Sequence, residues 1–196
     1  HPLFKKIKKT ELSFNDAKKL KIFSDSIGIE FFCSVFYPEA VDYLESLSVK
    51  RYKIASRTCT LNDPLSLETL SAVNHSKKST IVSMGMGGDK KFIKKILSKN
   101  QITFLYCLSE YPLKIEKIKW NIAQKYAGFS DHTLGITAPI IFASLMKMKK
   151  QKNIIIEKHV KLLNSKSLDA ATSLDMNQFK ILNDNLRNIE KLNFSP

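Results

Sequence analysis

Two stretches of the sequence share one pattern: GFSDHTLG at residues 128–135 and IIIEKHV at residues 154–160. Each begins as a short apolar run of strand length and ends in polar residues that include an acid and a histidine, His132 in the first and His159 in the second. A single instance would be typical of a loop tip. Two instances indicate strands that deliver their polar ends to a shared site.

Outward from these stretches, apolar runs of strand length alternate with helical patterns at a spacing of roughly 25 residues, the size of one strand, one helix and short loops. Strands are predicted over residues 29–35, 51–55, 79–83, 102–107, 127–130 and 153–157. Helices are predicted over residues 13–27, 38–47, 64–74, 89–99, 115–126, 137–148 and 175–192. Strand–helix repeats with nearly continuous apolar strands predict an α/β fold whose parallel sheet is covered on both faces.

Polar residues follow every predicted strand at its C-terminal end. They are Ser34, Lys53, Ser56, Ser83, Ser109, Glu110, Tyr111, Ser130, Asp131, His132, Glu157, Lys158 and His159. In a (β/α) barrel, the C-terminal ends of all the strands build the site, whereas a doubly wound sheet uses mainly one switch point. The pattern therefore favours a TIM-type (β/α)8 barrel, of which about six strand–helix units are recognisable.

The residue types at these strand ends indicate the chemistry of the site. His132 and His159 on neighbouring strands can both bind one divalent ion and leave positions for water and a substrate oxygen. Lys53, with hydroxyl groups around it, supplies one fixed charge and several hydrogen-bond donors, which predicts a phosphate-binding site. A lone strand-end histidine is more often a structural hydrogen-bonding group, so convergence on one face carries the prediction. His75 and His1 lack such a setting, and we expect both at the surface.

The composition indicates which kinds of ligand the protein attracts. The net charge is +14 and comes mostly from lysine, because arginine occurs only at Arg51, Arg57 and Arg187. Aromatic residues are not interleaved with the lysines as a base-stacking surface requires. We therefore expect solvated helix faces rather than nucleic-acid binding, together with attraction of small anionic substrates.

No apolar run approaches the roughly 20 residues that span a membrane, so no membrane partner is expected. Three unclustered cysteines, Cys33, Cys59 and Cys107, lie in or near apolar runs. They are predicted to be reduced core thiols of a cytoplasmic protein. The chain starts at His1 rather than methionine, and we expect it to begin inside a longer polypeptide.

The motifs on these elements resemble the NeuB-type N-acetylneuraminate (sialic acid) synthase family, which includes legionaminate and pseudaminate synthases. The matching stretches are GIEFFCSVF at 28–36, YKIAS at 52–56, SMGM at 83–86, YCLSEYP at 106–112, GFSDHTLGI at 128–136, IIEKH at 155–159, SLDAATSLDMNQF at 167–179 and NIEKL at 188–192. Their order and spacing are those of the family.

The resemblance implies a TIM barrel that condenses phosphoenolpyruvate with an open-chain N-acyl aldose, giving a sialic acid-type 2-keto acid and phosphate. His132 and His159 match the ligands of a divalent metal, Mn²⁺ or Mg²⁺, and together with Lys53 they are the predicted catalytic residues. The predicted phosphoenolpyruvate-binding residues are Lys53, Ser56, Ser83, Ser109, Ser130 and Ser34. The predicted sugar-binding residues are Tyr111, Asp169 and Glu157. The resemblance also implies a homodimer.

The chain departs from the family pattern in three ways. Family members begin with two further strands, which carry a glutamate-rich motif and a second lysine, and neither motif occurs in residues 1–196. They also carry a C-terminal antifreeze-like domain, which is not found here. Many have Gly-Glu after the YKIAS stretch, where this chain has Arg57-Thr58. Two hypotheses follow: a synthase whose other parts lie outside these residues, or a non-catalytic barrel remnant acting as a binding or assembly subunit.

Overall fold

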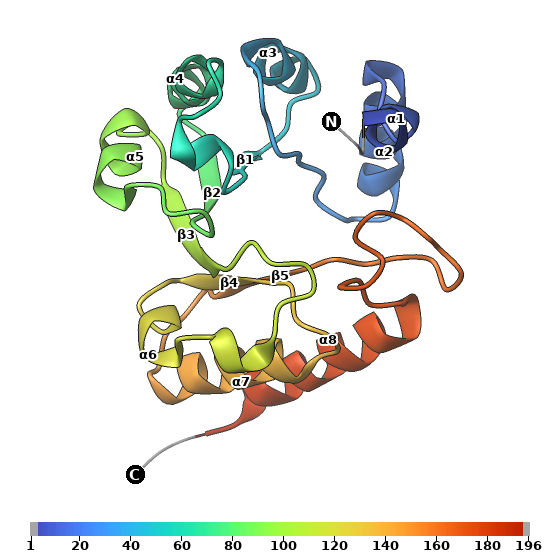
Figure 1. The fold of residues 1–196 in the computed structure, drawn as a ribbon, viewed down its shortest axis with the longest axis vertical. Coiled ribbons are helices and arrows are strands. Elements are labelled where there is room, and N and C mark those ends of the chain that lie inside the picture. Colours follow the sequence, from blue (N-terminus) through green and yellow to red (C-terminus); the bar gives the residue numbers. More distant parts are fainter. Residues whose placement is uncertain (1–3, 194–196) are drawn as a thin grey trace.

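Five parallel β-strands form a curled sheet, a half-barrel, in the computed structural model, which describes residues 4–193 (Figure 1). The strands are β1 (Arg51–Ile54), β2 (Ser79–Ser83), β3 (Ile102–Cys107), β4 (Gly128–Asp131) and β5 (Ile155–Lys158). Each strand pairs with the next along the chain, so the sheet order is β1-β2-β3-β4-β5. This order places all five C-terminal strand ends at one edge.

Helices surround the outer side of the curled sheet, as Figure 1 shows. They are α1 (Phe4–Lys9), α2 (Phe14–Ser26), α3 (Pro38–Ser46), α4 (Ser66–Ser76), α5 (Lys90–Ile96), α6 (Trp120–Ala123), α7 (Thr137–Met148) and α8 (Met176–Lys191). Two short 3₁₀ turns, η1 (Thr58–Thr60) and η2 (Ile115–Lys117), follow β1 and β3. None of the helices in the described part of the chain has the length and apolarity needed to cross a bilayer.

Successive side chains of each strand point alternately to the hydrophobic core and to the inner face of the half-barrel. Tyr52 and Phe129 are fully buried and belong to hydrophobic clusters that include residues of the surrounding helices. Their chain neighbours Lys53 and Ser130 lie on the opposite face, because successive side chains of a strand point to opposite sides. The inner face of the half-barrel is therefore the face that carries the polar groups.

The predicted strand at residues 29–35 is wrong. This segment forms a single parallel bridge, between Ser34 and Lys53, with one hydrogen bond from Val35 N to the Lys53 carbonyl and one from Lys53 N to the Cys33 carbonyl. No described strand pairs with its other edge, so nothing extends the ladder. The structure thus has five strands in its described residues where six were predicted.

The predicted helix at residues 115–126 is also wrong in extent, because it is broken into η2 and the four residues of α6. Ile118 between them is extended and buried. The backbone N–H of Lys119 donates to the Tyr106 hydroxyl at 3.2 Å instead of to a helical carbonyl. Burial of Ile118 and this hydrogen bond favour the interruption over a continuous helix.

Several smaller predictions are confirmed. The three cysteines are free thiols, two of them buried and Cys33 partly buried. Burial raises the pKa of each thiol, most strongly that of Cys59, to about 12. His75 lies exposed in the last turn of α4. His1 lies outside the described residues.

Candidate active site at the carboxyl edge of the half-barrel

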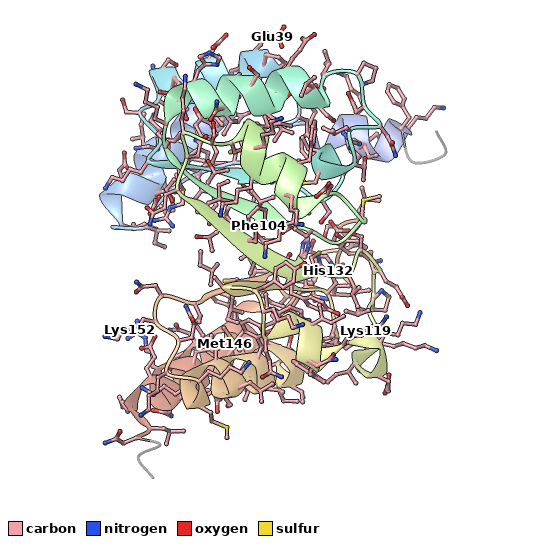
Figure 2. The ribbon with its side chains drawn as sticks, turned by 90° about the vertical axis from the view of Figure 1, so that its left-hand side faces the viewer. Glu39, Phe104, Lys119, His132, Met146 and Lys152 are labelled. Carbon is pink, nitrogen blue, oxygen red and sulfur yellow. The ribbon has the colours of Figure 1, made fainter. Side chains whose placement is uncertain are left out.

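The C-terminal ends of the strands open into a pocket of about 460 Å³. Figure 2 shows the two ends of the parallel strands. His132, which follows β4, lies on the opposite side of the molecule from Lys152, which precedes β5. The pocket is lined by Ser34, Phe36, Lys53, Ala55, Ser56, Arg57, Ser83, Met86, Cys107, Ser109, Tyr111, Ser130, His132, Glu157 and His159. Except for Asp169, every predicted site residue lines it.

One end of the pocket concentrates hydrogen-bonding groups around a buried ammonium. Lys53 Nζ donates to Ser83 Oγ at 2.9 Å, and both side chains are almost fully buried. The backbone N–H of Gly85 donates to Ser56 Oγ at 2.8 Å. A Cβ at Gly85 would lie 2.6 Å from Cys107 Sγ, so the loop after β2 approaches the pocket wall more closely than a side chain allows. Such donors around a fixed charge are suited to an anion.

Glu157 connects this end to the neighbouring strands. Its carboxylate lies 3.3 Å from Lys53 Nζ and accepts a hydrogen bond from Ser130 Oγ at 2.6 Å. Ser130 and Lys53 were predicted to bind phosphoenolpyruvate and Glu157 to bind sugar, so the structure brings together groups assigned to two ligands. In this arrangement the Ser130 hydroxyl proton is directed to Glu157.

The two histidines lie side by side above β4 and β5. Their ring centroids are 5.4 Å apart, and His132 Nδ1 lies 2.8 Å from the Leu108 carbonyl oxygen. Because that carbonyl can only accept, Nδ1 carries the hydrogen and the Nε2 lone pair is left free. Burial lowers the pKa of His132, and the neighbouring His159 lowers it further. The neutral imidazole is the form that binds metal ions.

Tyr111 and Asp169 flank the histidine pair. The Tyr111 ring is stacked at a tilt on His132, with 4.1 Å between centroids, and meets His159 edge-on at 6.0 Å. Burial, with nearby negative groups, raises the pKa of Tyr111 to about 12, which keeps the phenol protonated. Asp169, from the irregular segment after β5, reaches back until its carboxylate is 4.0 Å from His159 Nδ1.

The histidines fit a divalent ion as a partial ligand set. A free Nε2 on His132, a second imidazole beside it and an open pocket match a site that keeps positions for water and substrate oxygens. Within the described residues, no group of three or more histidine, cysteine or acidic side chains is arranged to hold a metal. His132 and His159 would therefore supply two protein ligands to such an ion, and its other coordination positions would need other donors.

Sequence reasoning missed five pocket residues: Phe36, Ala55, Arg57, Met86 and Cys107. Cys107 is the last residue of β3 and alternates with the outward-facing Tyr106, so strand periodicity could have placed it. Phe36 and Arg57 come together only because the Ser34–Lys53 bridge sets two loops side by side. No local sequence signal indicates that contact.

The fold and the pocket define a protein of the (β/α)-barrel class with a polar site at its carboxyl edge. The structure is similar to that of the N-acetylneuraminic acid (sialic acid) synthetase from Leptospira borgpetersenii, with a TM-score of 0.79 and 23% identity over 96% of this chain and 68% of that one. The sequence matches the NeuB family over residues 1–194. The chain belongs to the NeuB family.

Two relatives illustrate its place in the family. The chain is 33% identical to the uncharacterized protein MJ1065 of Methanocaldococcus jannaschii, over 98% of this chain and 57% of the relative. It is 30% identical to the N,N'-diacetyllegionaminic acid synthase of Campylobacter jejuni, over 94% of this chain and 57% of that enzyme. The chain thus spans about half the length of the curated relatives it matches.

Proposed function

We propose that the protein is a sugar acid synthase that condenses phosphoenolpyruvate with an N-acyl aldose to form a sialic acid-type 2-keto acid and phosphate. The single observation that carries the proposal is the convergence of a buried lysine, hydroxyl groups and two adjacent histidines in one pocket. Membership of the NeuB family and the synthase names of its relatives support it.

In this proposal the phosphate of the donor lies at the Lys53 end. The Lys53 ammonium would attract the phosphate, and the hydroxyls of Ser34, Ser56, Ser83, Ser109 and Ser130 would donate to donor oxygens. Ser130 would turn its proton from Glu157 to the ligand. The aldose would lie near Tyr111, Asp169 and Glu157, which offer one phenol and two carboxylates to sugar hydroxyls.

A divalent ion, Mn²⁺ or Mg²⁺, held by His132 and His159 would supply Lewis-acid polarisation of the aldehyde. A carbon–carbon bond forms as the methylene carbon of phosphoenolpyruvate attacks the aldehyde carbon. Water then adds to the resulting cationic carbon, and its two protons go to the former aldehyde oxygen and to the phosphate. Phosphate leaves by cleavage of its bond to that carbon, and the oxygen from water becomes the keto oxygen. The pocket residues would hold the two substrates so that the reacting carbons meet.

Isothermal titration calorimetry of phosphoenolpyruvate and MnCl₂ tests the proposed site directly. We expect Lys53→Met to weaken phosphoenolpyruvate binding at least about tenfold, because a charge-assisted hydrogen bond is lost. Lys50→Met is the matched control, since Lys50 is exposed and lies just before the N-terminal end of β1. Absence of phosphoenolpyruvate binding by the unmodified protein, or equal loss in both variants, would contradict the proposal.

A further inference from the structure

Arg57 lines the pocket but has no role in the function proposed above. It follows the buried Ser56 directly and is the N-cap residue of the turn η1 after β1. The backbone N–H and the hydroxyl of Thr60 both donate to the Arg57 carbonyl, at 3.2 and 2.8 Å. With Thr58 also buried, the backbone of Arg57 is held in place on both sides while its side chain stays exposed.

The guanidinium of Arg57 is held by an aromatic ring. Its central carbon lies 4.9 Å from the centroid of the Phe36 ring, a distance at which a cation is attracted to the ring face. Phe36 is carried to this position by the hydrogen bond from Val35 N to the Lys53 carbonyl. A guanidinium that stacks through its face keeps its N–H edge available for a fork-shaped contact with an anion.

The charges of the pocket single out Arg57. The lysine and arginine residues that line the pocket are Lys53 and Arg57. Lys53 Nζ already has the Glu157 carboxylate at 3.3 Å. No carboxylate in the described part of the chain lies within salt-bridge distance of Arg57. A ligand with both a phosphate and a carboxylate brings more negative charge than the Lys53–Glu157 pair can balance, because that pair is neutral as a unit.

We infer that Arg57 binds the phosphate of the donor through its guanidinium. This inference rests on the proposed function and goes beyond it by assigning a second phosphate-binding cation. The position favours the phosphate over the sugar. Arg57 adjoins Ser56, whose Oγ accepts from Gly85 N at the Lys53 end, whereas Tyr111 and Asp169 flank the histidines.

The test is calorimetric titration with phosphoenolpyruvate and, separately, with inorganic phosphate. The proteins are the unmodified chain, Arg57→Gln, Arg57→Lys and the control Arg187→Gln, which removes the same charge from an exposed position on α8. We expect Arg57→Gln to raise the Kd of both ligands at least about tenfold and Arg57→Lys to restore part of the affinity, because a point charge replaces a fork. Arg187→Gln should bind both ligands as the unmodified chain does.

Each other outcome has one meaning. Binding by Arg57→Gln within twofold of the unmodified chain would overturn the inference and leave the proposed function standing. A loss confined to phosphoenolpyruvate, with inorganic phosphate unaffected, would place Arg57 on the carboxylate and overturn the phosphate assignment. Failure of the unmodified chain to bind phosphoenolpyruvate would overturn the proposed function, and the inference with it. If Arg187→Gln weakened the binding of both ligands as much as Arg57→Gln does, the loss of affinity would come from the lower net charge alone. That result would also overturn the inference.

Discussion

Lys158 Nζ lies 2.6 Å from Asp131 Oδ2, and both side chains are almost completely removed from solvent, with exposed fractions of 1% and 0%. Asp131 also accepts from the backbone N–H and hydroxyl of Thr133. Lys158 additionally donates to the Thr133 carbonyl. The pair joins the C-terminal ends of β4 and β5 directly below the histidines, because each partner immediately precedes one of them in the chain.

Replacing one member of the Asp131–Lys158 pair should lower the stability of the fold. Lys158→Met leaves the Asp131 carboxylate buried without its counter-charge, so we expect a loss of about 3–5 kcal/mol in the free energy of unfolding, measured by urea titration. The double variant Asp131→Asn/Lys158→Met removes both charges, and it should be more stable than the single variant. Lys152→Met, at an exposed lysine before β5, serves as the control. A loss below 1 kcal/mol in Lys158→Met would show that the pair does not fix these strand ends.

Two glycines should respond differently to alanine. At Gly85 the added Cβ would meet the side-chain ends of Cys107 and Ser109 at 2.6 and 2.7 Å. Both line the pocket, so we expect weaker phosphoenolpyruvate binding and a modest loss of stability. At Gly128 the Cβ would lie 2.5 Å from the Ile155 carbonyl oxygen, and backbone cannot step aside. Gly128→Ala should therefore lower the free energy of unfolding by at least about 2 kcal/mol.

Calorimetry and urea unfolding, applied to both glycine variants, separate the two effects. Stability losses of equal size, with donor affinity preserved in Gly85→Ala, would contradict the close approach of the loop after β2 to the pocket wall.

Cys59 predicts a stability change at alkaline pH. Burial raises its pKa from 9.0 to about 12, so as the pH rises above 9 the unfolded thiol loses its proton before the folded one does. Stability therefore falls with rising pH in this window. Compared with Cys59→Ser, the unmodified protein should lose about 0.8 kcal/mol more between pH 7.5 and pH 9.5 in urea unfolding. If the difference in the free energy of unfolding between the unmodified protein and Cys59→Ser stayed the same over this pH range, Cys59 would have to ionise in the folded state as well.

Much of the fold follows from local sequence pattern. The strands from β1 to β5 were predicted because apolar runs and C-terminal polar residues are local features. Pairing at the sheet margin was not predictable, because a single bridge at Ser34 depends on which edges have partners. For the same reason the contact between Phe36 and Arg57 was missed. The hydrogen bond from Ser130 to Glu157 depends on strand register, which the pattern of one strand does not contain.

The central claim is the condensation itself. Its most direct test is phosphate release from phosphoenolpyruvate by the purified chain with N-acetylmannosamine and related N-acyl aldoses, with Mn²⁺ and without it. His132→Ala is compared with His75→Ala, which removes an exposed histidine on α4. We predict release that requires both aldose and metal, is retained in His75→Ala and is abolished in His132→Ala. No aldose-dependent release by the unmodified chain would contradict the claim and favour the non-catalytic binding or assembly subunit.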